Sequence, residues 1–300
     1  MTDEIQGPRH VVDARSESFP EALKTIPRPP QKLYVIGALE SLVPGLAVIG
    51  ARKATPYGLS CARRFARLAA EKGVLIISGG ARGCDSEAHW AALKAESPTV
   101  VFLGGGCDVV YPPEHAQLFQ RIVDSGGAIV SERSWATPPK PFMFRERNRL
   151  IAGLADAVLI VEAGLPSGTF STADEALDAG KEVLVVPGAI TSEASYGSNR
   201  LLFQGASPII DDESFEDALF RSCGVLKRLK GNGDDAPEED PIVRCVLAQP
   251  IDSEALYGLA VEEYGADGAR AKLMEVLVEA EARGVIARQG DGRWGPVVRS

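Results

Sequence analysis

Six short runs rich in Val, Ile, Leu and Ala recur along the first two thirds of this 300-residue chain, at intervals of about 25 to 30 residues. A strand that is apolar at successive positions is buried on both faces of its sheet. The segments between the runs have a helical pattern: in residues 57–73 an apolar stripe runs from Leu59 to Ala69, and Gly73 is placed to end the helix. Alternating strands and helices with short connections predict an α/β fold, a doubly wound and mostly parallel sheet. The six runs are residues 46–50, 74–78, 99–104, 127–131, 157–162 and 182–188.

Glycine and polar residues gather directly after these runs, most densely in Ser-Gly-Gly-Ala-Arg-Gly at residues 78–83. Doubly wound sheets bind ligands outside the carboxyl ends of their strands. Glycine lets backbone amides approach a ligand, and the helix that follows directs its positive end toward the same place. The sequence therefore predicts an anion site at this edge, although a tight turn that binds nothing has the same composition.

Positive charge is concentrated in one segment of an acidic chain. The net charge of −9 argues against a uniformly basic surface that coats nucleic acid. Residues 133–149, in contrast, hold five basic side chains and one acidic side chain, a local charge of +4, and phenylalanines lie among them in Lys-Pro-Phe-Met-Phe-Arg-Glu-Arg-Asn-Arg. Cations for phosphate beside rings for unpaired bases are the mixture that single-stranded nucleic acid requires.

Several classes of protein are disfavoured. The five cysteines are scattered and form no Cys-x-x-Cys pair, so neither disulfides nor a zinc site is expected. No Ser-His-Asp order and no Walker lysine is present, and we expect neither a cofactor nor a metal. The N-terminus lacks a secretory pattern and no apolar run is long enough to span a membrane, so a cytoplasmic protein without a membrane partner is expected.

The composition divides the chain into four segments. Residues 1–30 are polar and rich in proline, which predicts a flexible N-terminal extension, and residues 31–225 form the sheet domain. Residues 226–240 read as an acidic linker. Residues 241–300 have three helical patterns followed by a hairpin that turns at Gly290, Asp291 and Gly292, which predicts a small winged-helix-like domain.

The C-terminal domain has an unusual charge for that fold. Residues 241–300 hold nine acidic and seven basic side chains, a net charge of −2. A recognition helix that enters a DNA groove normally carries a basic face. Protein contact or weak duplex binding is therefore the better expectation for this domain.

The motifs of residues 18–210 resemble, in order and spacing, those of the DprA (DNA-processing protein A, or Smf) family. They include AVIGARKATPYG, ISGGARGCDSEAH, LGGGCDVVYP, FRERNRLIAGLADAVLIVEA, SGTFSTADEAL and VPGAITSEASYGSNRLLFQGA. The resemblance implies a Rossmann-like domain that binds single-stranded DNA, forms a homodimer and loads a RecA-type recombinase in natural transformation.

The resemblance also implies where DNA binds. Arginines and a glycine-rich loop would meet phosphate, Phe144 would stack on an unpaired base, and polar residues after the fifth and sixth strands would close the pocket. Two positions depart from the family pattern: Arg145 stands where proline is common, and Cys84 where an aliphatic residue is usual. The expected site is Gly50, Arg52, Ser78, Gly79, Gly80, Arg82, Gly83, Lys140, Phe144, Arg147, Asn148, Arg149, Ser167, Gly168, Thr169 and Asn199.

Two other functions are open at this stage. One is a phosphoribohydrolase of the LOG type, whose Gly-Gly-x-Gly-Thr-x-x-Glu motif is nearest to SGTFSTADE here, but Thr172 occupies the position of the glutamate and Glu175 comes three residues later. The other is a sensor of free nucleotides that uses the same pocket without catalysis. Asp85 is interpreted as a helix-capping residue and His89 as a core histidine.

Overall fold

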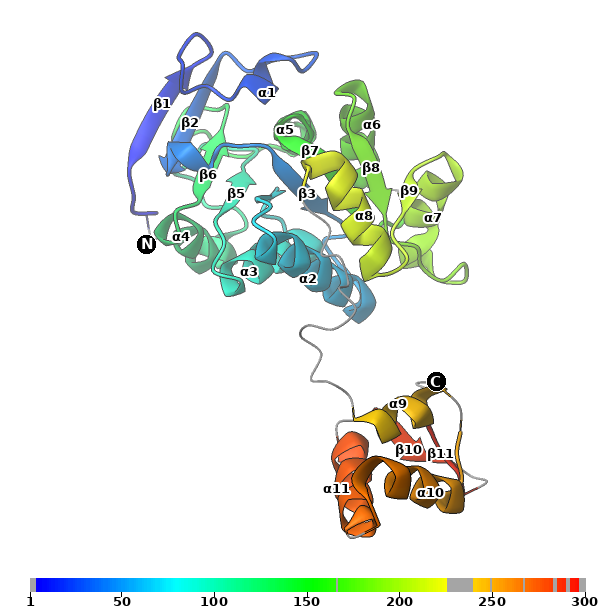
Figure 1. Cartoon of the computed structure of the whole chain (residues 1–300). Coiled ribbons are helices and arrows are strands. Elements are labelled where there is room, and N and C mark those ends of the chain that lie inside the picture. Colours follow the sequence, from blue (N-terminus) through cyan, green and yellow to red (C-terminus); the bar gives the residue numbers. More distant parts are fainter. Residues whose placement is uncertain are drawn as a thin grey trace. The chain divides into compact units, whose positions relative to one another are not determined.

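A nine-stranded sheet dominates the first part of the chain, and a smaller unit of helices and two strands follows it in sequence (Figure 1). The computed structural model describes residues 4–165, 167–225, 240–248, 250–266, 268–282, 285–289 and 292–296. These residues divide into two compact units, Met1–Lys227 and Arg228–Ser300.

All six apolar runs form strands of the large sheet. They are β3 (Gly45–Ile49), β4 (Ile76–Ser78), β5 (Thr99–Phe102), β6 (Ala128–Ser131), β7 (Ala155–Ile160) and β8 (Glu182–Val185). These strands and the short β9 (Ser207–Pro208) are parallel. The order β1-β2-β6-β5-β4-β3-β7-β8-β9 shows that the chain moves outward from β3 to β6 and then returns to β7, on the other side of β3. The predicted doubly wound, mostly parallel sheet is confirmed.

Helices cover both faces of the sheet (Figure 1). Successive residues of a strand point to opposite faces, so in β3 Ala47 and Ile49 belong to one core, and Leu46 and Val48 to the other. The first core packs against α1 (Glu21–Lys24), α5 (Pro141–Leu154) and α6 (Thr169–Asp178). The opposite face is covered by α2 (Pro56–Glu71), α3 (Cys84–Lys94), α4 (Ala116–Asp124) and α8 (Asp212–Cys223). Helix α7 (Tyr196–Phe203) precedes β9.

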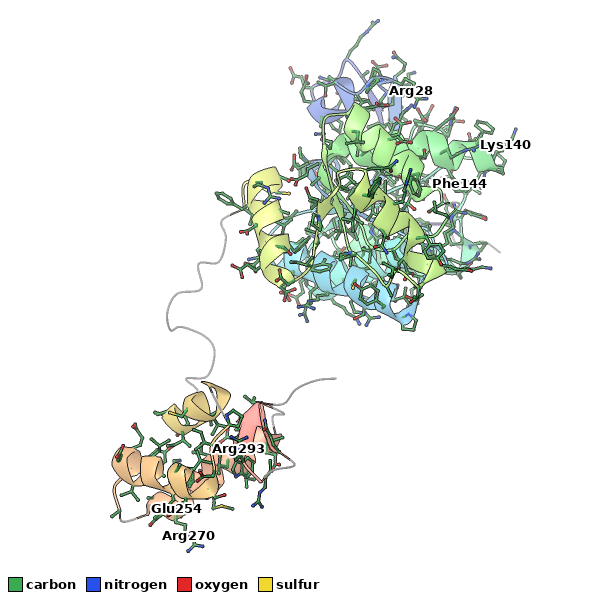
Figure 2. All side chains as sticks on the ribbon, turned by 90° about the vertical axis from the view of Figure 1, so that its right-hand side faces the viewer. Arg28, Lys140, Phe144, Glu254, Arg270 and Arg293 are labelled. Carbon is green, nitrogen blue, oxygen red and sulfur yellow. The ribbon has the colours of Figure 1, made fainter. Side chains whose placement is uncertain are left out.

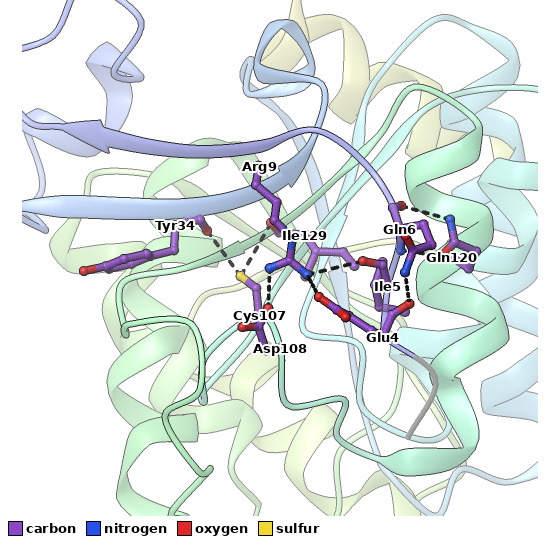
Figure 3. Close-up of polar contacts among 9 residues, drawn as sticks. All are labelled: Glu4, Ile5, Gln6, Arg9, Tyr34, Cys107, Asp108, Gln120 and Ile129. Carbon is purple, nitrogen blue, oxygen red and sulfur yellow. Dashed lines mark hydrogen bonds and ion pairs between the residues drawn. The ribbon is translucent and has the colours of Figure 1, made fainter. Parts of the chain in front are cut away.

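The N-terminal residues belong to the sheet. Strand β1 (Arg9–Asp13) pairs antiparallel with β2 (Lys32–Gly37), which pairs antiparallel with β6. The Arg9 guanidinium forms ion pairs with Glu4 and Asp108 (Figure 3) and lies 5.2 Å from the Trp135 ring centre. The prediction of a flexible extension is therefore wrong for these residues. An edge strand needs only one buried residue, here Val12, so the polar composition of this segment concealed it.

His89 is a core histidine, as expected. The Thr99 hydroxyl donates to the Ile76 carbonyl at 2.7 Å, so it accepts from Nδ1 of His89 at 2.8 Å. Burial lowers the pKa of His89 to about 3. The ring is therefore neutral at physiological pH, and its fixed tautomer links α3 to β5.

The second unit contains three helices followed by a strand pair, in the predicted order. They are α9 (Pro241–Ala248), α10 (Ser253–Tyr264), α11 (Ala269–Ala282), β10 (Ile286–Arg288) and β11 (Trp294–Pro296). A separate apolar core that includes Val243, Leu256 and Leu277 holds them together. The predicted acidic linker, except Asp240, and residues 290–291 of the predicted turn lie outside the described residues. No helix within the described ranges is long and apolar enough to cross a membrane.

Candidate nucleic-acid interface

A pocket of about 480 Å³ opens where β3 and β7 lie side by side and the chain leaves them in opposite directions. Such a switch point is the usual ligand site of a doubly wound sheet, because the loops diverge and leave a crevice. The pocket is lined by residues 49–52 after β3, by Ala81 and Asp85 at the start of α3, by one face of α5, and by residues around the start of α6. Four segments distant in sequence therefore meet here.

The glycine-rich loop at residues 78–83 supports the pocket by close packing. A Cβ on Gly83, whose φ is +79°, would meet the backbone of the loop after β3, and one on Gly79 would lie 2.6 Å from the Arg147 guanidinium. Ser78 is buried, and its hydroxyl donates to the Val48 carbonyl at 2.6 Å. Gly79 and Gly80 are buried as well as Ser78. The sequence predicts that the backbone amides of this loop point at a ligand, whereas these three residues are packed within the protein.

Arg147 is the buried cation beneath the pocket. The residue is only 5% exposed, and its Nη1 donates to the Gly79 carbonyl at 2.8 Å and to the Phe102 carbonyl. These carbonyls end β4 and β5, so Arg147 joins two strand ends to α5. Nη1 is thus engaged within the protein while Arg147 also lines the pocket, so its direct contact with phosphate stays a prediction.

Asp85 provides the opposing charge. It is 6% exposed, and its Oδ2 accepts from the Ala81 amide at 3.3 Å. Burial raises the pKa of Asp85, whereas the nearby Arg147 charge acts to lower it. Burial also lowers the pKa of Arg147 to about 10, which leaves the guanidinium charged at neutral pH. The Asp85 carboxyl and the Arg147 guanidinium thus interact electrostatically, a role of Asp85 in addition to its place in the first turn of α3.

The ring of Phe144, which lines the pocket, is contacted by a cation and by a second ring. The Arg52 guanidinium lies 5.5 Å from the centre of the Phe144 ring. The centres of the Tyr111 and Phe144 rings are 5.3 Å apart. Gly104 allows Phe144 to approach, since a Cβ there would lie 2.9 Å from the ring. Arg52 and Tyr111 are exposed, and Phe144 is half-buried. We call Arg52, Phe144 and Tyr111 the stacking row.

Tyr111 is the member of this row that sequence reasoning missed. It lies in the quoted motif LGGGCDVVYP, but it belongs to a loop without periodicity, so the sequence gives no sign of where its ring points. Arg145, noted only as a departure from the family pattern, also lines the pocket and is exposed. Its charge is thus available to a ligand.

The expected site residues separate into two groups. Gly50, Arg52, Phe144, Arg147, Asn148, Ser167, Gly168 and Thr169 line the pocket. The remaining eight lie outside the lining, and four of their side chains are held by polar contacts: Ser78 with the Val48 carbonyl, Arg82 with Glu114, Arg149 with Glu132 at 2.5 Å, and Asn199 with the backbone of Gly188. Lys140 is exposed and extends outward just before α5 (Figure 2). It remains free for a ligand that extends beyond the pocket.

The acidic residues near α6 bear on hydrolase chemistry. Thr172, at the position of the phosphoribohydrolase glutamate, lines the pocket and is buried. Glu175 instead pairs with Arg28 at 2.5 Å. The Glu175 carboxylate is therefore engaged outside the pocket lining. Within the described part of the chain, no three His, Cys, Asp or Glu side chains are placed to hold a metal ion.

The fold and the pocket define a doubly wound α/β protein with a cation-and-ring site at its switch point. The sequence model of the DNA recombination-mediator protein A family matches residues 10–219. Protein Smf of Escherichia coli K12 is 40% identical over 234 residues, which are 78% of this chain and 63% of that protein. DNA processing protein DprA of Bacillus subtilis is 32% identical over 212 residues, 70% of this chain and 71% of that protein. The chain belongs to the DNA recombination-mediator protein A family, known as DprA or Smf.

Solved structures agree with this assignment. DNA processing protein A from Helicobacter pylori, solved for its single-stranded DNA binding mode, has a TM-score of 0.66 and 32% identity, and the match covers 73% of this chain and 98% of that one. DprA from Streptococcus pneumoniae has a TM-score of 0.63 and 31% identity, and the match covers 70% of this chain and 74% of that one. The match spans 63%, 53% and 52% of the E. coli, Synechocystis and Mycobacterium tuberculosis relatives.

Proposed function

We propose that this protein binds single-stranded DNA at the switch-point pocket, as a DNA-processing protein of recombination and transformation. The observation that carries the proposal is the stacking row, in which the exposed Arg52 and the Tyr111 ring each contact the ring of Phe144, a residue of the pocket lining. A ring accepts any unpaired base, and a neighbouring guanidinium neutralises phosphate. The H. pylori relative, described by its binding of single-stranded DNA, supports the same assignment.

The path of the strand follows from the exposed cations. Arg52 and Arg145 line the pocket, and Lys140 precedes the same helix as Arg145. Each is exposed and forms no ion pair with a described residue. We infer that the DNA backbone runs along the start of α5 with one base against Phe144. This arrangement places local positive charge on a protein whose net charge is −9.

Binding to single- and double-stranded oligonucleotides over a salt series tests the proposal. We expect tighter binding of single strands, because a duplex does not offer its bases to the rings, and weaker binding as salt rises from about 50 to about 200 mM, because phosphate contacts release counterions. Free nucleotides at the same nucleotide concentration should compete poorly with oligo-dT. Equal affinity for duplex would contradict the proposal, and strong competition by a mononucleotide would favour nucleotide sensing instead.

A catalytic role is not part of this proposal. A phosphoribohydrolase of the LOG type needs a carboxylate at the position of Thr172, and Glu175 is paired with Arg28. Incubation with AMP separates the two functions: we propose that the protein releases no adenine, and adenine release above the buffer control would revive the enzyme hypothesis.

Family membership supports two further parts of the proposal, delivery of the bound strand to a RecA-type recombinase and homodimer formation. For the second, the β9 edge of the sheet carries large exposed apolar residues: Leu177 is 65% exposed, Phe203 81% and Ile210 71%. Exposed apolar residues of α6, of α7 and of the segment after β9 form a surface that a second copy can bury.

The winged-helix assignment of the second unit rests on the order of its elements.

Phe203→Glu is expected to convert the protein to a monomer, because a charge in the centre of an apolar contact is left without a partner. Light scattering after gel filtration measures the mass. The matched control is Val11→Glu, which places the same charge on an exposed residue at the opposite, β1 edge. A monomeric unmodified protein, or a dimer that survives Phe203→Glu, would overturn the assignment of this interface.

A further inference from the structure

The second unit contains a groove between α10, α11 and its strand pair, with a volume of about 480 Å³. Leu256, Leu273 and Leu277 belong to the core of the unit and form the apolar floor. Tyr257 and Met274 also line the groove, and they are 44% and 55% exposed. Large apolar side chains at the surface above an apolar floor favour contact with a partner side chain, and the volume lies in the range of about 300 to 1,000 Å³ that is usual for binding sites.

Two arginines from different elements line the same groove. Arg270 lies in the first turn of α11, extends into solvent (Figure 2), and has no hydrogen bond or ion pair with a described residue. Arg288 lies in β10, where its Nε donates to the Gly292 carbonyl at 3.3 Å, and it too forms no ion pair with a described residue. Both charges are therefore available at the groove.

The two groove arginines, which have no ion pair with a described residue, stand out because residues 241–300 are acidic as a whole. Residues 241–300 hold nine acidic and seven basic side chains. Carboxylates are thus abundant, yet neither groove arginine is paired with one in the described structure. Lys272, on the same helix but outside the groove lining, is paired with Glu275 at 3.1 Å. Of Arg270, Lys272 and Arg288, only the two arginines that line the groove have no ion pair with a described residue.

We propose that the groove binds an acidic peptide segment of a partner protein, with a large apolar side chain of that segment on the leucine floor and its carboxylates on Arg270 and Arg288. An apolar anchor in a desolvated pocket gives affinity, and the flanking charges give orientation and selectivity. Duplex DNA fits the observations less well, since phosphates have no use for an apolar floor and the unit is net negative. The inference does not depend on the switch-point pocket.

Fluorescence anisotropy with the full-length protein tests the groove. The probe is a labelled, end-blocked peptide Asp-Asp-Leu-Phe-Asp-Asp, and the comparison peptides replace all aspartates by lysine or Leu-Phe by Ala-Ala. We expect binding of the first peptide only, with affinity that falls as salt rises. Comparable binding of the lysine peptide, or no binding of the aspartate peptide, would overturn the proposal.

Matched variants locate the site. Arg270→Gln should weaken peptide binding by about threefold to fivefold, the range of a partly exposed ion pair, and the double variant with Arg288→Gln by about tenfold. Lys272→Gln removes the same charge from the same helix outside the groove and should leave the affinity within about twofold. An equal loss in Lys272→Gln would refute the groove as the site.

A duplex competitor decides between the two classes of partner. Displacement of the bound peptide by a mixed-sequence duplex, with loss of duplex binding in Arg270→Gln, would show a nucleic-acid surface and overturn the proposal. No displacement supports it. All three variants should retain the single-strand affinity of the unmodified protein, so failure of the groove proposal and failure of the proposed function give different results.

Discussion

Arg147→Met is expected to lower the free energy of unfolding of the first unit by about 3 to 5 kcal/mol. Methionine fills much of the space of the arginine stem but provides no donor. The carbonyls of Gly79 and Phe102 would lose their contacts with Nη1, and buried Asp85 would lose its opposing charge. Leaving a buried charge and two buried acceptors without a partner is among the costliest changes in a protein interior.

Chemical denaturation measures this effect, with Trp90 and Trp135 as fluorescent reporters in the first unit. The matched control is Arg145→Met, an exposed position on the same helix, which should change stability by less than about 0.5 kcal/mol. The double variant Arg147→Met with Asp85→Asn should lose less than the sum of the single losses, because the carboxylate no longer lacks a partner. An Arg147→Met protein as stable as the unmodified one, but unable to bind DNA, would instead show that Arg147 acts as a direct phosphate contact.

Phe144→Ala is expected to weaken binding of single-stranded DNA by about 1 to 3 kcal/mol, the usual contribution of one base stacked on an aromatic ring, with the salt dependence nearly unchanged. Arg52→Ala should instead weaken binding of every sequence alike and reduce the slope of log affinity against log salt by about 1, because it removes one phosphate contact. The Arg52 guanidinium and the Phe144 ring centre lie 5.5 Å apart, so the two variants separate the contribution of stacking from that of charge within one site.

Phe142→Ala is the control for stacking. Phe142 is exposed on the same helix, two residues earlier, and does not line the pocket. Its truncation should leave the affinity within about twofold of the unmodified value, since it removes no base contact. Thermal unfolding of each variant tests the alternative that Phe144 serves packing: a lowered melting temperature with full affinity at low temperature would refute the stacking role.

Recovery of the sheet from the sequence depended on burial. Runs such as residues 157–162 are apolar at successive positions as far as Val161, because both faces of a central strand are covered, and their short length favours a strand over a helix. The apolar stripe of residues 57–73 was equally clear, since Ala62, Phe65 and Ala69 all face the core. Edge strands give no such signal: β1 buries only Val12, and β9 has two residues.

The sequence by itself determined the strands, the helix periods and the family, because each depends on local composition or on a motif read in order. It also predicted Arg52 and Phe144 as site residues, and both line the switch-point pocket. Only the tertiary structure decided what each charge does. Phe144, Arg147 and Asn148 lie on one helix and read alike as a basic, aromatic motif, yet Arg147 is buried and Phe144 is half-buried. The burial of Arg147 depends on Asp85 and on the carbonyls of two strand ends, and the second ring of the stacking row comes from a loop 33 residues before Phe144. A buried charge is stable only where distant segments bring it partners, and no local pattern reports which segments those are.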